Sequence, residues 1–392
     1  MLKRISLYLF HIFSTLIVLL IVGLIILLSE DGGIHYGDNP IKMTWDNDGP
    51  YVFYEGDSLL HVQYVHGKMD DGFYSTNDLY PIDSAFKSKS YFNLDSTSFS
   101  FYIDANAIQI PATKYSDDEP IFAVSDIESG YKTFRDLLLH NEIIDKDLEW
   151  NFGQGHLVLV GDFVDRGFST TQTLWFIYKL EQEAQKVGGN VHFILGNHEL
   201  KVMQANFEAS SPKYAYLSYI LKKQQHQLYN RQSFLGRWMS SKNSLELING
   251  HLFVHGGIHP KVAQLNFDID QMNEFLRSRY YDGYFKQQQE SAEQLLTSTQ
   301  TGPNWYRGYF KDETLTQKDV ELGLDLFGAE AVVVGHTLQS KVNRSFNGIV
   351  IGIDVQHPND YHKNWPKRSS EALLITDGKY FRVLADGEKI EI

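Results

Sequence analysis

HLVLVGDFVDRG (156–167) and VHFILGNHE (191–199) are the stretches that decide the fold. Each is a run of mostly apolar residues that ends at a glycine and a polar side chain, as buried parallel strands do. IFAVSD (121–126) has the same form and lies one strand–helix–strand unit upstream. EALLITDGKYFRVL (371–384) predicts a hairpin that turns at its central Asp-Gly pair. We therefore expect an α/β fold whose strands deliver polar residues to one sheet edge, where ligand sites form.

Five loops that follow apolar runs of this kind share one character, because each carries a side chain that binds hard or borderline metal ions. Carboxylate and amide oxygens and imidazole nitrogens suit Mn, Fe or Zn, and a pair of such ions can hold a phosphoryl group. One such motif alone would more often be an ordinary turn, but five in order at strand ends indicate a metal site. They are Asp126 in SDIES, Asp162 with Asp165 and Arg166 in GDFVDRG, Asn197 and His198 in GNHE, His255 in VHGG, and His336 in GHT.

The composition excludes several other classes of protein. There is no cysteine, so thiolate catalysis, Cys-zinc sites and disulfides are excluded. A net charge of -14 disfavours nucleic acid as a partner. No P-loop, nucleophile elbow or HExxH motif supports another mechanism. An acidic protein that binds phosphate must also supply positive charge at the site itself.

The five motifs resemble the signature of the calcineurin-like metallophosphoesterase superfamily: D-x-H, GDxxDRG, GNHE, a later His, and GH. The resemblance covers roughly 119–386. FVHGGIHP (253–260) and TGPNWYRGYF (301–310) are similar to the phosphoprotein phosphatase family, and nearest to its bacterial, Shewanella-like branch. The resemblance implies a β-sandwich flanked by helices and a phosphomonoesterase or phosphoprotein phosphatase activity. A nucleotide or dinucleoside-polyphosphate hydrolase and a catalytically weak, membrane-tethered binding protein are the alternatives.

The resemblance also implies a centre of two divalent metal ions, for which we expect Mn, with Fe, Zn or Mg as alternatives. Asp162 would bridge the ions, and Asp126 would belong to the first site. Asn197, His255 and His336 would complete the second site. A metal-bridging hydroxide would attack phosphorus in line.

Four further side chains take catalytic roles by the same resemblance. Arg166 and Arg307 would hold the phosphate oxygens, because guanidinium forks match that geometry. These arginines would also supply the positive charge that the acidic chain needs. His198, oriented by Asp165, would protonate the leaving alcohol as a general acid.

Glu128 departs from the family pattern, which has histidine at that position of the first motif. Glutamate can ligate a metal at about the same distance, near 2.0–2.2 Å. It adds negative charge and a harder oxygen, which should shift the preference toward Mn or Mg. We expect a first metal site rebuilt around oxygen ligands, Glu128 included. A protein that works with one metal and an inactive descendant are the alternatives.

The segment Leu7–Leu28 carries no formal charge and is long enough to cross the ~30 Å hydrocarbon core of a bilayer. Lys3 and Arg4 precede it, and Glu30 and Asp31 follow it, so the bulk of the chain should lie outside the cytoplasm. A cleaved signal peptide is the alternative, but LLSEDGG offers no A-x-A cleavage site. We expect a single-pass membrane protein with a periplasmic or extracellular catalytic domain.

Three segments follow from these patterns. Residues 1–31 form the signal-anchor, 32–118 form a linker and a small β-rich region, and 119–392 form the catalytic domain. Helix-like stretches at 200–244 and 262–300 are expected to cap the ligand edge. The β-rich region could be a spacer, a second layer on the catalytic domain or a partner surface. The partners we expect are a phosphorylated protein or small molecule and the membrane.

Overall fold

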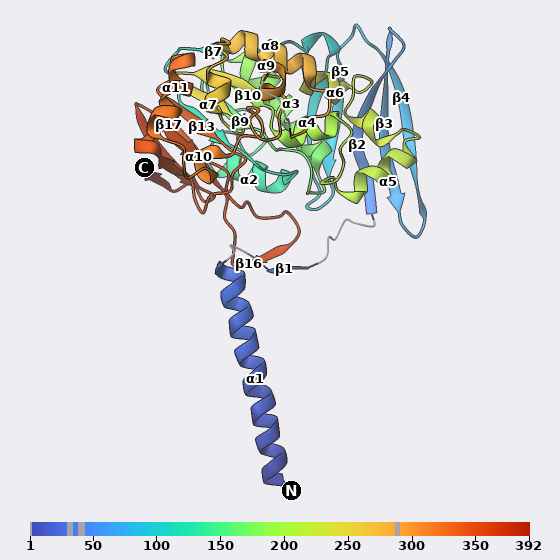
Figure 1. The fold of residues 1–392 in the computed structure, drawn as a ribbon. Coiled ribbons are helices and arrows are strands. Elements are labelled where there is room, and N and C mark those ends of the chain that lie inside the picture. Colours follow the sequence, from blue (N-terminus) through green and yellow to red (C-terminus); the bar gives the residue numbers. More distant parts are fainter. Residues whose placement is uncertain (1, 30–33, 38–43, 287–290) are drawn as a thin grey trace.

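Two six-stranded sheets form the centre of the computed structural model, which describes residues 2–29, 34–37, 44–286 and 291–392 (Figure 1). The first sheet runs in the order β10 (Asn190–Ile194), β9 (His156–Val160), β8 (Ile121–Val124), β17 (Glu371–Thr376), β18 (Lys379–Leu384) and β19 (Lys389–Glu391). The second runs β14 (Asn343–Ser345), β15 (Val350–Gly352), β13 (Ala331–Val334), β12 (His251–Val254), β11 (Leu245–Ile248) and β7 (Lys114–Tyr115). Ile121 and Val158 of the first sheet share one buried cluster with Phe253, Val333 and Ile351 of the second. This shared core makes the two sheets a β-sandwich, as predicted.

The strands β8, β9 and β10 pair in parallel; β8 and β9 are buried on both faces along their whole length, and β10 is buried over its last three residues. The residues that alternate with the sandwich core, such as Phe122 and Leu157, belong to a second cluster. Helices α2 (Tyr131–His140) and α3 (Thr170–Lys186) supply Phe134 and Trp175 to that cluster. Burial on both faces explains why these strands read as continuous apolar runs rather than alternating ones.

The predicted hairpin is β17 and β18, which pair antiparallel along their whole length. Asp377 and Gly378 turn it with φ of 50° and 71°. Positive φ at both central residues is what a tight two-residue hairpin turn requires, and Asp-Gly supplies it at little cost. The same logic holds for Asn249 and Gly250, which join β11 to β12.

The β-rich region packs against α3. It contains β2 (Thr44–Glu55), β3 (Leu59–Lys68), β4 (Gly72–Pro81), β5 (Phe86–Phe92) and β6 (Thr97–Ile103). The indole of Trp175 donates to the carbonyl of Pro50 at 2.8 Å, and its ring stacks on Phe101 with centroids 4.8 Å apart. The sequence left three roles open for the β-rich region, and this packing against α3 fits one of them, that of a second layer.

A buried ion pair ties this layer to the loop after β9. Lys213 Nζ lies 2.6 Å from Asp48 Oδ2 and donates to the carbonyl of Phe168 at 3.1 Å. The side chains of Asp48 and Lys213 are only 3% and 1% exposed. Strand β2 therefore braces the backbone that follows GDFVDRG.

The helix-like stretches fold into short helices. They are α4 (Asn197–Met203), α5 (Pro212–Ile220), η2 (Gln225–Leu228), α6 (Phe234–Ser240), α7 (Pro260–Ala263), α8 (Ile269–Arg279) and α9 (Ala292–Leu296). Elsewhere the chain forms η1 (Ala105–Ala107), α10 (Gly308–Lys311), α11 (Gln317–Phe327) and η3 (Phe346–Gly348).

Helix α1 (Leu2–Ser29) extends away from the rest of the molecule (Figure 1). Lys3–Leu27 has a mean hydropathy of 2.8 and no buried part, so it is long and apolar enough to cross a membrane, although a signal sequence would suit the same description. The short strand β1 (Ile34–Tyr36) pairs antiparallel with β16 (Lys363–Trp365). The acidic pair at 30–31, on which the predicted orientation partly depends, lies outside the described residues.

Candidate active site

The loops that leave the strands at one edge of the sandwich hold an unusual backbone. Left-handed conformations cost energy in residues other than glycine and cluster at functional sites. Here φ lies between 50° and 66° at Asp126, Glu128, Ser129, Asp162, Asp165, Arg166 and His336. All of them except Ser129 are residues that the sequence motifs singled out.

Two motif glycines are required by the closeness of these loops. A Cβ on Gly196 would lie 2.2 Å from Oδ1 of Asp162, and a Cβ on Gly335 would lie 2.6 Å from Oδ2 of Asp126. A side chain at either position would fill the space beside a predicted metal ligand. The glycines of GNHE and GHT therefore allow the strand ends to converge.

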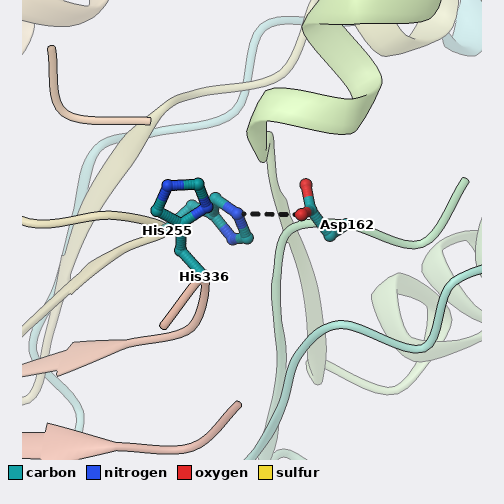
Figure 2. Close-up of side chains that lie close together, drawn as sticks. All are labelled: Asp162, His255 and His336. Carbon is teal, nitrogen blue, oxygen red and sulfur yellow. Dashed lines mark ion pairs between the residues drawn. The ribbon is translucent and has the colours of Figure 1, made fainter. Parts of the chain in front are cut away.

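Asp162, His255 and His336 form the centre of the site, with ligand atoms that all lie within 4.8 Å of one another (Figure 2). All three residues are buried. Nε2 of His255 lies 3.2 Å from Oδ2 of Asp162. Nδ1 of His255 contacts the carbonyl of Val160 at 2.7 Å, which fixes the tautomer and leaves Nε2 with a lone pair. Nε2 of His336 contacts the carbonyl of Trp305 at 2.9 Å, which leaves Nδ1 for the cluster.

Two more predicted ligands adjoin this cluster. Oδ1 of Asn197 lies 3.1 Å from Nε2 of His255, and Oδ2 of Asp126 accepts from the backbone N–H of His336 at 3.1 Å. Asn197 is 2% and Asp126 8% exposed. Oxygen and imidazole donors, buried and held by backbone contacts, fit a divalent ion of the first transition row.

The charges of the site favour a cation in the same way. Burial, with the charges of Glu128 and Asp162, raises the pKa of Asp354 to about 8. Burial and Asp354 raise the pKa of Asp126 well above its usual range. Burial alone would lower the pKa of His255, but the Asp162 carboxylate outweighs it and raises that pKa to about 9. The carboxylates of Asp354 and Asp126 therefore take up protons when no cation is near, and a divalent ion would displace those protons.

Glu128 lies in the same cleft but contacts an arginine. Nη1 of Arg166 donates to its Oε1, and the two side chains are 56% and 32% exposed. Burial raises the pKa of Glu128, and Arg166 opposes that rise. The carboxylate thus engages one of the two arginines expected to hold phosphate, and its role as a metal ligand stays a prediction.

His198 and Asp165 form the buried pair that the sequence predicts. Nδ1 of His198 lies 2.8 Å from Oδ2 of Asp165, and the hydroxyl of Ser210 donates to Oδ1 of Asp165 at 2.8 Å. The side chains of His198 and Asp165 are 4% and 0% exposed. Nε2 of His198 lies 3.5 Å from both Arg166 Nη2 and Lys201 Nζ. Sequence reasoning missed Ser210 and Lys201, which no motif marks.

Glu199, the last residue of GNHE, was not assigned a role from the sequence, although the motif contains it. Its carboxylate accepts the backbone N–H groups of Asp162, Phe163 and Gly196 at 2.9, 2.7 and 2.8 Å. It is fully buried. Glu199 therefore holds the GDFVDRG and GNHE loops in register with each other.

The cleft has a volume of about 330 Å³, and its outer wall comes from a segment that the sequence did not single out. Arg166 and Arg307 line it, and both are exposed at its mouth. Its remaining walls include Asp354, Val355, Gln356, His357, Pro358, Asn359, Asp360, Tyr361 and Arg368. Of the described residues, those of 200–244 and 262–300 do not line this cleft, so the helices there stand behind it or beside it. GIVIGID (348–354) is an apolar run that ends in Asp354, just as the other motif runs end in a polar residue. This pattern was the signal in the sequence that could have identified Asp354 as a site residue.

His357 anchors that wall to the first motif. Its Nε2 lies 3.0 Å from the carbonyl of Ser125, and burial lowers its pKa to about 4. Asp360 accepts the backbone N–H groups of Lys132 and Thr133 at 3.0 and 2.9 Å and so caps α2. The wall is held at both of these points.

A β-sandwich whose strand ends gather carboxylates, imidazoles, an amide and two arginines defines a phosphoester hydrolase. The calcineurin-like phosphoesterase family, whose members use a dinuclear metal centre, matches residues 119–340, and the chain belongs to that family.

Phosphatases of the Shewanella-like branch are among the proteins to which the chain is similar. Shewanella-like protein phosphatase 1 of Plasmodium berghei is 26% identical over 227 residues, which are 56% of this chain and 61% of that protein. Shewanella-like protein phosphatase 2 of Arabidopsis thaliana is 30% identical over 105 residues, 27% of each chain. The chain thus matches less than two thirds of the length of both relatives.

A solved structure matches most of the chain. The cold-active protein-tyrosine phosphatase of a psychrophilic Shewanella species is 27% identical with a TM-score of 0.73, and the match covers 88% of this chain and 98% of that one. That share is more than residues 119–392 alone could supply. The common fold therefore includes much of the β-rich region.

Proposed function

We propose that this protein is a phosphoprotein phosphatase that depends on two divalent metal ions and is held at a membrane by α1. The observation that carries the proposal is the buried cluster of Asp162, His255 and His336 beside the His198–Asp165 pair. The three-residue cluster suits the binding of metal ions, and the His198–Asp165 pair suits the transfer of a proton. The names of three similar proteins, two protein phosphatases and a protein-tyrosine phosphatase, support a phosphorylated protein as the substrate.

Six residues would hold the ions. Asp162 would bridge them, Asp126 and Glu128 would complete one site, and the other ligands are Asn197, His255 and His336. When bound, such ions polarise phosphoryl oxygens and lower the pKa of water. Three carboxylates among six ligands favour Mn over Zn.

The arginines at the mouth of the cleft would receive the phosphate. Arg307 already donates to the backbone carbonyl of His336, which places its guanidinium beside the cluster. Arg166 would have to exchange its contact with Glu128 for a phosphate oxygen. Binding therefore exchanges one charge-assisted contact for another, and the phosphate must compete with Glu128 for the same fork.

His198 would donate the proton that the leaving alcohol needs. Its Nδ1–H is held by Asp165, so Nε2 is the nitrogen that can exchange a proton with the substrate. Asp165 would position the ring and stabilise its charged form, and Ser210 would position Asp165. A buried acid with two aligned supports is well preorganised for this task.

Helix α1 would place this chemistry at a membrane surface. Lys3 and Arg4 lie at the N-terminal end of the span and would stay on the cytoplasmic side, which leaves the catalytic domain outside the cytoplasm.

The test is hydrolysis by the full chain, purified in detergent, of a panel of phosphate esters with added Mn. Phosphotyrosine and phosphoserine peptides should be hydrolysed with a higher kcat/KM than nucleotides or dinucleoside polyphosphates, and a chelator should abolish turnover. A clear preference for the nucleotide substrates would replace the phosphoprotein assignment with the alternative one. Full activity after chelation and removal of the metal would refute the metal-dependent mechanism.

A further inference from the structure

The segment 361–369 is a basic stretch in an acidic protein. The chain as a whole carries a net charge of -14, yet YHKNWPKRS contains Lys363, Lys367 and Arg368 and no acidic residue. Lys363, Trp365 and Lys367 are exposed, and Trp365 keeps 42% of its surface accessible. An exposed tryptophan among lysines is typical of segments that lie at a membrane–water interface.

The same segment pairs with the strand that follows α1. In the β1–β16 ribbon, Ile34 lies opposite Trp365 and Tyr36 lies opposite Lys363. Directly opposed residues and residues two apart share one face of a ribbon, so these four side chains lie on the same face. Ile34 is 50% and Tyr36 is 53% exposed. The face, called the ribbon face below, is thus aromatic, apolar and basic at once.

The ribbon lies close to the proposed membrane helix because of the length of chain between them. Helix α1 ends at Ser29 and β1 begins at Ile34. The five Cα–Cα steps from Ser29 to Ile34 span at most about 18 Å even when fully extended. Any bilayer that α1 crosses therefore has its surface within reach of the ribbon.

We propose that the ribbon face lies on the phospholipid headgroups of the bilayer that α1 crosses. Trp365 and Tyr36 would sit at the level of the headgroups, and Lys363 with neighbouring Lys367 would contact anionic lipids. This inference rests on the proposed membrane anchoring. The charge of the segment, its aromatic side chains and the short tether all favour lipid over a protein partner.

The contact has a consequence for the catalytic site. Tyr361 and Arg368, which flank the ribbon strand, both line the cleft. The hydrogen bond between His362 Nδ1 and the carbonyl of Gly37, at 2.6 Å, ties the same segment to β1. The cleft would therefore open near the bilayer surface. Phosphate groups carried on membrane-bound proteins would reach it at a high effective concentration.

The absence of cysteine allows a direct test with single-cysteine variants of the full chain. Ser369→Cys places a fluorescent label beside the ribbon face, and Ser278→Cys is the matched control. Both serines are exposed, and Ser278 belongs to α8, which lies at the end of the molecule opposite α1 (Figure 1). Each labelled variant is inserted in nanodiscs that contain either anionic or zwitterionic lipids, and a water-soluble quencher is added.

In anionic nanodiscs, quenching should be about threefold slower at Ser369→Cys than at Ser278→Cys. The added change Lys363→Ser with Lys367→Ser should remove most of that difference, because it removes the attraction to anionic headgroups. Equal quenching at both sites in anchored protein would overturn the inference. Shielding that persists in detergent and grows with protein concentration would assign the face to a second copy instead.

Two further results separate this inference from the proposals on which it rests. Release of the chain from membranes by alkaline carbonate would refute the anchoring, and the lipid contact with it. Retention of the chain with equal quenching would refute the lipid contact alone. A lack of phosphatase activity would refute the proposed enzymatic function, whereas the quenching of the labels would still test the lipid contact.

Discussion

Replacing His198 by alanine should slow the hydrolysis of alkyl phosphates far more than that of aryl phosphates. An alkyl leaving group needs a proton as the bond to phosphorus breaks, whereas nitrophenolate needs little. General-acid catalysis contributes about 10²–10⁴-fold. We expect a loss of that size with alkyl phosphates and a loss below about tenfold with nitrophenyl phosphate.

The supports of His198 set the size of two smaller effects. Asp165→Asn removes a charge from a 2.8 Å contact between side chains that are 4% and 0% exposed. A buried hydrogen bond to a charged group is worth about 1.5–3 kcal/mol, so alkyl turnover should fall by about 10- to 150-fold. Ser210→Ala removes only a neutral donor from Asp165, at 2.8 Å, and should cost about 1 kcal/mol, or about fivefold.

The assay is kcat/KM for both substrates at saturating Mn, with metal content measured on the same samples. Asn197→Ala, one residue away, is the control: it should lower metal occupancy, whereas His198→Ala should leave occupancy unchanged. Equal losses with alkyl and aryl substrates in His198→Ala would refute its role as the acid.

Three other predictions concern the metal site, stability and pH. Glu128→Ala should leave one metal site nearly empty, and Glu128→His should move the preference toward Zn or Fe; calorimetric titration that finds two ions bound with unchanged affinity in the alanine variant would make Glu128 a bystander. Asp48→Ala leaves the buried ammonium of Lys213 unpaired and should lower the free energy of unfolding, measured in urea, by about 3–5 kcal/mol. Adding Lys213→Met to Asp48→Ala should restore most of that loss. A loss below about 1 kcal/mol in Asp48→Ala would contradict this prediction. His357 has a pKa of about 4 in the fold against about 6.5 in the unfolded chain, so only the unfolded chain takes up a proton as the pH falls through that window. Stability should therefore be lost from pH 6.5 down to 4, by about 3 kcal/mol, and His357→Gln should remove that part of the loss; identical pH profiles for the two proteins would show that His357 does not contribute.

The resemblance to the family predicted the β-sandwich, and local patterns predicted the strands whose ends carry the residues of the candidate site. Apolar runs that end in a polar residue are typical of strands buried on both faces. Parallel pairing of β12 with β13 places His255 and His336 at one edge of the second sheet, and the packing of the two sheets brings Asp162, which follows β9 of the first sheet, beside them. The Asp-Gly hairpin and the helices of 200–244 and 262–300 were also readable from local chemistry.

Contacts between distant parts of the chain were not readable in this way. Trp175 meets the carbonyl of Pro50 across 125 residues, and no periodicity encodes that contact. The cleft wall from Asp354 to Tyr361 is irregular, so only Asp354, at the end of the apolar run GIVIGID, carried a signal in the sequence. The pairing of Glu128 with Arg166 depends on the left-handed backbone conformation of both residues, which a sequence motif does not specify.

The most direct test of the central claim is a comparison of the full chain with its Asp162→Asn variant, with bound metal and phosphate release measured on the same samples. Asp162 contacts His255 at 3.2 Å in the buried cluster and is the ligand that both ions would share. We predict that the wild-type chain binds two divalent ions and releases phosphate from a phosphopeptide, and that Asp162→Asn loses most of both. Phosphate release by Asp162→Asn at the wild-type rate, or no release by the wild type with Mn, Fe, Zn or Mg, would contradict the account.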